Sequence, residues 1–65
     1  MEALIKQLAK EMMNRGLPLR DTQLAIGCLD TKEQFEEMLA EVQQLETLTR
    51  SAAFAIAVTI ANDEE

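Results

Sequence analysis

Apolar residues recur at three- and four-residue spacing near the start of the chain. Leu4, Leu8 and Met12 follow this spacing, and charged residues lie between them. This is the pattern of an amphipathic helix, so we predict a helix over residues 2–15. Gly16 then stands where helices commonly end in a left-handed residue, which predicts the end of this helix as well.

Pro18 determines the geometry of the next segment. Proline disfavours helical backbone at Leu17, which precedes it, and has no amide hydrogen to donate. An extended connection should therefore follow the first helix, and a shorter helix is predicted over residues 21–29, with Asp21 or Arg20 near its cap. The apolar face of this second helix would comprise four residues: Leu24, Ala25, Cys28 and Leu29.

The clearest local signal is a capping box at the start of a third helix. Thr31 with Gln34, or Asp30 with Glu33, has the spacing at which each side chain binds the backbone amide of the other residue. A helix should therefore begin at about residue 32. The apolar positions that follow alternate in steps of three and four, as in helices that pack against other helices: Phe35, Met38, Val42, Leu45, Thr49, Ala52, Ile56 and Thr59.

Residues 52–61 are apolar almost throughout, and their pattern fits two structures. From Phe54 to Ile60 every second residue is large and the others are small, which is the period of a strand. The alanine content and the lack of a second strand candidate favour a helix. This helix is either continuous with the third one or separated from it by a break near 47–51, with Ser51 as a new N-cap.

These elements predict an all-α fold, a small bundle of about three helices in a single domain over residues 1–65. A chain of 65 residues buries a modest share of its surface, and a helix that is apolar on most sides needs cover on most sides. We therefore expect the bundle to be completed in a homo-oligomer, a dimer or larger. The expected oligomer interface comprises Phe35, Met38, Val42, Leu45, Glu46, Ala52, Phe54, Ile56 and Ile60.

Glu46 is the unusual member of that interface. A straight helix continued from Phe35 places its carboxylate inside the apolar stripe, where it should have a partner. Arg50 lies one turn further along and offers an ion pair. The alternatives are a pair across the oligomer interface that fixes the register of the helices, or a helix break before Glu46.

The charge of the chain is unevenly distributed. Residues 1–32 carry five bases and four acids, whereas residues 33–65 carry eight acids and one base, so the net charge of −6 comes from the second half. Such a surface repels phosphate backbones and anionic lipid and favours a basic protein partner. The expected acidic face lies on the third helix and comprises Glu33, Glu36, Glu37 and Glu41, unless these residues are simply a solvated surface.

Three function hypotheses follow from pattern and charge. The first is a non-enzymatic protein–protein interaction or scaffold module that acts as a homo-oligomer. The second is an acidic inhibitor or antitoxin-like regulator that binds a basic, nucleic-acid-processing partner. The third is a helix-turn-helix DNA-binding protein over residues 22–39. The negative charge of its second helix disfavours this hypothesis, because that helix would present Glu33, Glu36 and Glu37 to DNA, with Lys32 as the one base.

Candidate chemistry is sparse. The chain has no histidine and one cysteine, so the usual ligand sets of zinc, iron and copper are missing. Cys28 has no neighbouring base to form a thiolate, and we expect it to be a buried apolar residue. We predict no catalytic residue, metal or cofactor. The unpaired cysteine and the lack of an apolar leader segment favour a cytoplasmic protein without a membrane span.

Overall fold

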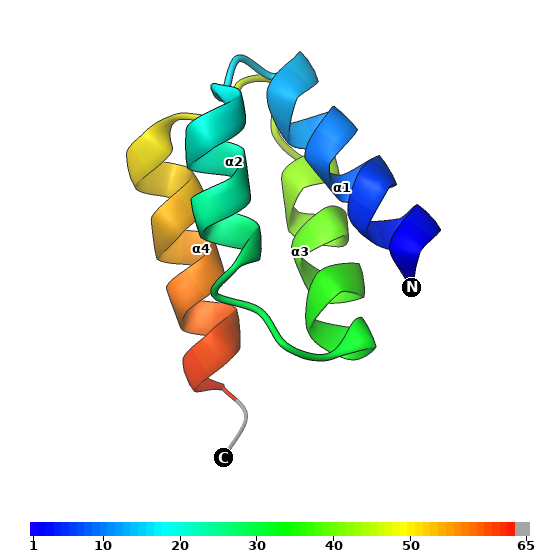
Figure 1. Ribbon diagram of the computed structural model, residues 1–65. Helices are drawn as coiled ribbons and strands as arrows, with labels where there is room; N and C mark the ends of the chain where they lie inside the picture. The colour runs from blue at the N-terminus through cyan, green and yellow to red at the C-terminus, as the bar shows by residue number, and fades with distance from the viewer. Residues whose placement is uncertain (64–65) are drawn as a thin grey trace.

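The fold is an all-α bundle, as the sequence predicts. The computed structural model describes residues 1–63, which contain four helices and no strand. The helices are α1 (Glu2–Asn14), α2 (Leu19–Ile26), α3 (Lys32–Gln43) and α4 (Arg50–Asn62). Successive helices run in opposite directions (Figure 1), so short connections suffice to join them.

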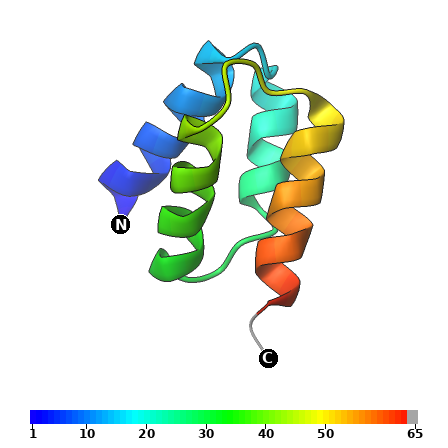
Figure 2. The ribbon, with the colours of Figure 1, turned by 180° about the vertical axis from the view of Figure 1, so that it is seen from behind.

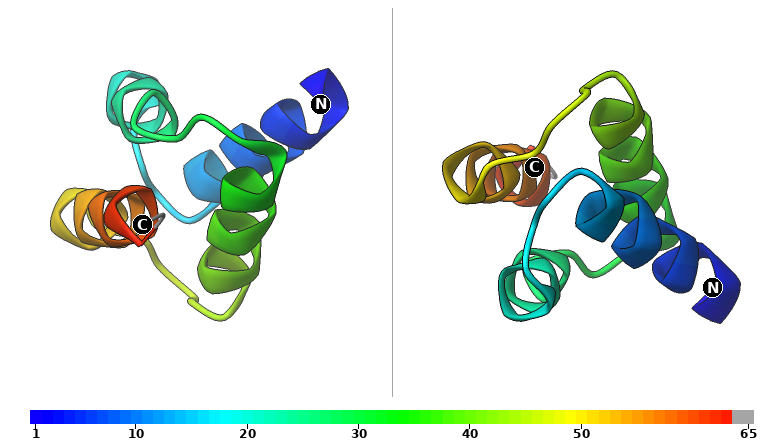
Figure 3. Two further views of the ribbon diagram at one scale, coloured as in Figure 1. Left: turned by 90° about the horizontal axis from the view of Figure 1, so that it is seen from below. Right: turned by 90° about the horizontal axis from the view of Figure 1, so that it is seen from above.

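Each helix packs against two others. α1 contacts α2 and α3, and α4 contacts the same two helices from the other side. Views from below and above show α1 inclined to the other three helices (Figure 3). The buried apolar residues come from all four helices and the connections between them: Leu8, Met12, Leu17, Ala25, Leu29, Phe35, Met38, Val42, Leu48, Ala53, Ala57 and Ile60.

The first helix and its end match the prediction. α1 ends within one residue of the predicted boundary, and Gly16 has a φ of 103°, the left-handed region expected of a glycine after a helix. Pro18 is extended, with φ −62° and ψ 155°, as predicted. α2, however, begins at Leu19 and not near Asp21. The Pro18 carbonyl accepts hydrogen bonds from both the amide and the hydroxyl of Thr22, each at 2.9 Å, and so closes the first turn two residues earlier.

The capping box at the start of α3 is confirmed for one of its two candidate pairs. The Gln34 amide donates to Thr31 Oγ1 at 3.1 Å, and Gln34 Oε1 accepts from the Thr31 amide at 3.2 Å and from the Asp30 amide at 2.6 Å. These bonds satisfy the backbone groups that a helix start leaves without partners. They also explain why the Gln34 side chain is buried.

The prediction of one continuous long helix is wrong, and the alternative prediction of a helix with a break is confirmed. α3 ends at Gln43 and α4 begins at Arg50, with Thr49 and not Ser51 as its N-cap; the Ala52 amide donates to Thr49 Oγ1 at 3.1 Å. The segment Ala52–Ala61 is helical, as predicted in preference to a strand. Dividing the long helix gives four helices where about three were expected.

Arg15 supplies the physical reason for the break. Its Nε donates to the Leu45 carbonyl at 2.7 Å, and its own carbonyl accepts from the Leu48 amide at 3.0 Å. In a continuous helix the Leu45 carbonyl and the Leu48 amide would instead form hydrogen bonds within that helix. Leu48 is buried as well, so the connection is anchored to the end of α1 by polar and apolar contacts.

Candidate functional site

The predicted oligomer interface is not one continuous surface of the chain. Four of its residues are buried in the core of the bundle: Phe35, Met38, Val42 and Ile60. Four more are partly buried and pack against that core: Leu45, Ala52, Phe54 and Ile56. α4 therefore covers, within one chain, much of the apolar surface that a second chain was expected to cover. Self-association stays a prediction.

Glu46 lies outside any apolar stripe. It is exposed in the connection between α3 and α4, so its predicted burial and the predicted ion pair are wrong, and the alternative of a helix break before Glu46 is confirmed. Arg50, the expected partner, instead lies 3.9 Å from the Asp21 carboxylate. Its guanidinium also lies 5.8 Å from the ring centroid of Phe54, within cation–π range.

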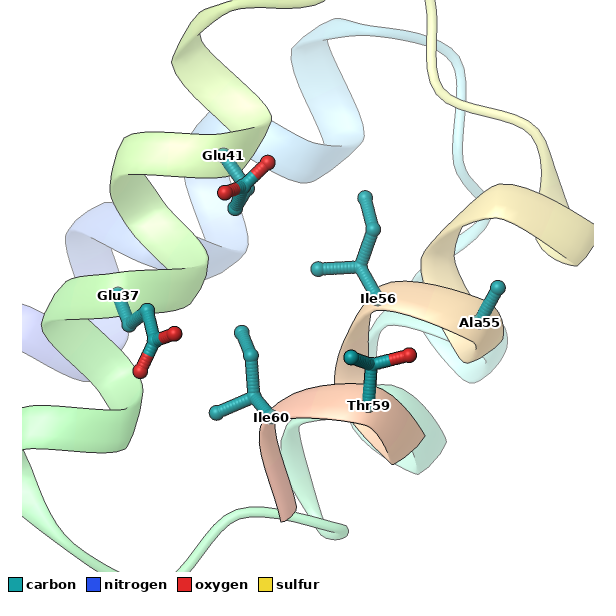
Figure 4. A pocket seen from close by; sticks show the side chains of 6 residues that line it. All are labelled: Glu37, Glu41, Ala55, Ile56, Thr59 and Ile60. Atoms are coloured by element: carbon teal, nitrogen blue, oxygen red, sulfur yellow. The ribbon is translucent and has the colours of Figure 1, made fainter. Parts of the chain in front are cut away.

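A groove of about 260 Å³ lies between α3 and α4. These two helices lie side by side on the face of the bundle that Figure 2 shows. α3 contributes two carboxylates to the groove, and the close-up in Figure 4 shows two isoleucine side chains that point from α4 toward α3. The lining residues are Glu37, Glu41, Ala55, Ile56, Thr59 and Ile60.

The groove follows from residue spacing on the two helices. Glu37 and Glu41 are four residues apart on α3, and Ile56 and Ile60 are four residues apart on α4, so each pair forms a row along its helix. The side of α4 that enters the core carries the fully buried Ala53 and Ala57 together with Ile60, which is 4% exposed. Ile60 therefore belongs to the core and adds little exposed surface to the groove, whereas the partly buried Ile56 provides most of its apolar wall.

The two walls of the groove differ in character. Ile56 and Ile60 make the α4 wall apolar, whereas the α3 wall carries the exposed carboxylates of Glu37 and Glu41. Within residues 1–63 neither carboxylate makes an ion pair. The groove therefore combines an apolar surface with negative charge that the described part of the chain does not neutralise.

The structure divides the predicted acidic face. Glu33 and Glu36 are exposed on α3 but do not line the groove, whereas Glu37 and Glu41 do. Thr59 and Ala55 also line the groove, and the sequence pattern did not predict them as site residues. The available signal was their position one turn apart on the outer, uncharged side of α4.

The remaining candidate residues do not gather into a second site in the described chain. Cys28 is exposed, which corrects the prediction of a buried residue; α2 ends at Ile26, before the thiol could turn into the core. Within residues 1–63 no three residues among Asp, Glu, Cys and His are placed to hold a metal ion. None of the helices there has the length and apolar character needed to cross a membrane.

Known proteins give no guide to the groove. No family model, curated protein or solved structure matches this chain. The arrangement of Glu37 and Glu41 opposite Ile56 and Ile60 is therefore the observation from which a function can be argued.

Proposed function

We propose that this protein is a non-enzymatic protein–protein interaction module that binds its partner in the groove between α3 and α4. The observation that carries the proposal is the pairing of an apolar wall, Ile56 and Ile60, with two carboxylates that have no ion-pair partner within residues 1–63. Apolar surface bordered by polar or charged residues is the usual composition of a protein-binding site. A groove of this kind binds side chains of another protein.

The size of the groove supports a protein partner over a small molecule. Its volume of about 260 Å³ is at the lower end for small-molecule pockets, which usually measure roughly 300–1,000 Å³. It is also partly open to solvent, so a small ligand would keep part of its own surface exposed. One or two anchoring side chains of a protein fit a space of this size.

Site-specific photo-crosslinking tests the proposal. A benzophenone amino acid replaces Thr59 in the groove or, as a control, Gln7, which is exposed on α1. α1 and α4 lie on opposite sides of the pair formed by α2 and α3. We expect adducts of defined mass from position 59 and none of the same mass from position 7.

A charge-reversal pair provides the second control for crosslinking. Replacing Glu37 and Glu41 together by lysine should suppress the adducts from position 59. Replacing Glu33 and Glu36 by lysine changes the net charge by the same amount on the same helix, outside the groove, and should not suppress them. The groove would be excluded as the binding surface if adducts persisted when Glu37 and Glu41 are both lysine. It would also be excluded if the two double substitutions reduced the adducts equally.

A second candidate function uses the outer ridge of α3 in place of the groove. All four acidic-face residues, Glu33, Glu36, Glu37 and Glu41, are exposed on that helix. A convex acidic ridge suits an inhibitor or antitoxin-like regulator that inserts into the basic cleft of a nucleic-acid-processing protein. In that case the two charge-reversal pairs weaken binding equally, which separates this function from groove binding.

Homo-oligomerisation is a further use that the groove allows. Light scattering across a hundredfold range of protein concentration tests it directly. An increase in mass that Glu37→Lys with Glu41→Lys abolishes would identify a second copy as the partner. A monomer mass that stays constant with concentration would mean that the partner in the groove is a different protein.

A further inference from the structure

We propose that the groove binds an amphipathic helix of another protein, one that carries Lys or Arg at positions i and i+4 beside apolar residues of the same spacing. This inference rests on the groove being the binding surface. It adds the chemistry of the partner: its secondary structure, the sign of its charge, and the arrangement of the two kinds of side chain.

The spacing within the groove is the first step. Glu37 and Glu41 form one row and Ile56 and Ile60 form the other. α3 and α4 are in contact and run in opposite directions. Residues four apart on a helix are separated by about 6 Å along its axis, at about 1.5 Å per residue. A helix that lies along the groove repeats its own side chains at the same interval, so two successive turns can each meet one carboxylate. Its apolar side chains would contact the partly buried Ile56 and the small exposed part of Ile60.

Backbone hydrogen bonding distinguishes a helix from an extended peptide. A bound strand could also place side chains about 6–7 Å apart on one face. Its amides and carbonyls, however, would need partners, and the walls of this groove are the sides of α3 and α4, whose own backbone groups are bonded within each helix. A helix satisfies its backbone internally and therefore leaves no backbone hydrogen bond unmade along the groove.

The sign of the charge follows from the α3 wall. Glu37 and Glu41 are exposed and make no ion pair within residues 1–63. The chain as a whole has a net charge of −6, so a basic helix is attracted at long range and an acidic one is repelled. Because the carboxylates lie on one wall and the isoleucines on the other, cations on the partner must flank its apolar row and not lie opposite it.

A second copy of this chain meets only part of this requirement. Lys6 and Lys10 are exposed on α1 at the required spacing. The large apolar residue beside Lys6 is Ile5, and it packs against the core of its own bundle. Met13, one turn after Lys10, is exposed, so α1 of a neighbouring molecule can offer the cations with one large apolar side chain and not with a row of them. Two molecules of charge −6 also repel each other. A separate, basic protein fits the groove better.

A designed peptide provides the test. The probe is a labelled helical peptide of about 15 residues, long enough to form a helix when capped, with Leu at i and i+4 and Lys at i+1 and i+5. The control peptide has the same composition, with the lysines moved to the opposite face. Fluorescence anisotropy titrations of wild-type protein should give an affinity for the probe about tenfold or more above that for the control peptide.

Protein variants then assign the charge contacts. Glu37→Lys with Glu41→Lys should lower the affinity for the probe by about tenfold or more, whereas Glu33→Lys with Glu36→Lys should lower it by about threefold or less, through long-range repulsion alone. A probe with Glu in place of its lysines should bind the first variant better than it binds wild type. All four residues are exposed, so circular dichroism should show the same helix content in every variant.

Four results would overturn the inference. Equal affinity for the two peptides would mean that the arrangement of side chains does not matter, and equal loss in the two variants would favour the ridge of α3. Self-association abolished by reversal of Glu37 and Glu41 would identify a second copy as the occupant. Groove-dependent crosslinking at Thr59 without binding of the probe would retain the proposed function while excluding a basic helix as the partner.

Discussion

Replacing Arg15 by methionine tests the contact that makes the chain turn between α3 and α4. Methionine keeps much of the aliphatic stem but has no donors. The substitution removes the hydrogen bond from Nε to the Leu45 carbonyl at 2.7 Å, and also the bonds from the guanidinium to the Glu11 carboxylate at 2.6 Å and the Glu11 carbonyl at 3.0 Å. The Leu45 carbonyl is then left without this partner.

The magnitude follows from the exposure of each contact. A hydrogen bond from a charged donor contributes about 1.5–3 kcal/mol. The ion pair with Glu11 adds only about 0.2–1 kcal/mol, because its side chains are 17% and 29% exposed and solvent screens the pair. We expect the free energy of unfolding to fall by about 2–3 kcal/mol. A domain of this size has about 3–10 kcal/mol in total, and its melting temperature should fall by on the order of 10 °C.

Urea unfolding followed by far-ultraviolet circular dichroism measures this loss. Glu11→Ala is the matched control, because it removes the ion pair and leaves the bond to the Leu45 carbonyl in place. Its cost should stay below about 1 kcal/mol. Hydrogen exchange of the Leu48 amide, which donates to the Arg15 carbonyl, should accelerate in Arg15→Met. A loss in Arg15→Met no larger than that in Glu11→Ala would refute the role given to this contact.

The remaining predictions concern local features. Gly16→Ala should destabilise the protein by about 1 kcal/mol because the φ of Gly16 is 103°; steric contact plays no part, since the added Cβ would meet no described atom within 4 Å. Gly27→Ala should change stability less because the φ of Gly27 is −64°, although the added Cβ would lie 3.3 Å from the Gln23 carbonyl oxygen. Thermal unfolding compares the two. Thr31→Ala and Thr49→Ala should each cost about 0.5–2 kcal/mol in urea unfolding through loss of an N-cap. Cys28 should react with a thiol reagent in the folded protein at nearly the rate found in denaturant, and slow reaction would contradict its exposure.

Features that depend on neighbouring residues could be predicted from the sequence. Gly16 marks the end of α1, and the Thr31 and Gln34 side chains bind each other's backbone amides, because both signals act within four residues. The break after α3 could not be located in the same way. The spacing of apolar residues continues through it, and the group that binds the Leu45 carbonyl lies 30 residues earlier in the chain, at Arg15.

The face that α2 presents to the core also escaped prediction. The sequence places Leu24 in the core and gives Thr22 no role, whereas Leu24 is 51% exposed and Thr22 is fully buried. A buried hydroxyl is acceptable there because Thr22 Oγ1 donates to the Pro18 carbonyl. That bond depends on the helix starting at Leu19, which places Thr22 in its first turn. Thr22 lies three residues before Ala25, so both side chains lie on the face that packs against the core, and Leu24 does not.

The turn between α3 and α4 also decides how the groove can be used. A continuous helix would have exposed an apolar seam that only another chain could cover, as in obligate oligomers. With the turn, α4 packs against α3 within one chain, where Phe35 and Met38 are buried, and Ile56 is left beside the carboxylates of Glu37 and Glu41. The sequence assigned these carboxylates and this isoleucine to separate surfaces, and the fold makes them opposite walls of one groove. A surface of this size has room for few anchoring side chains, so partner binding there should depend strongly on the two charges and weaken as salt is added.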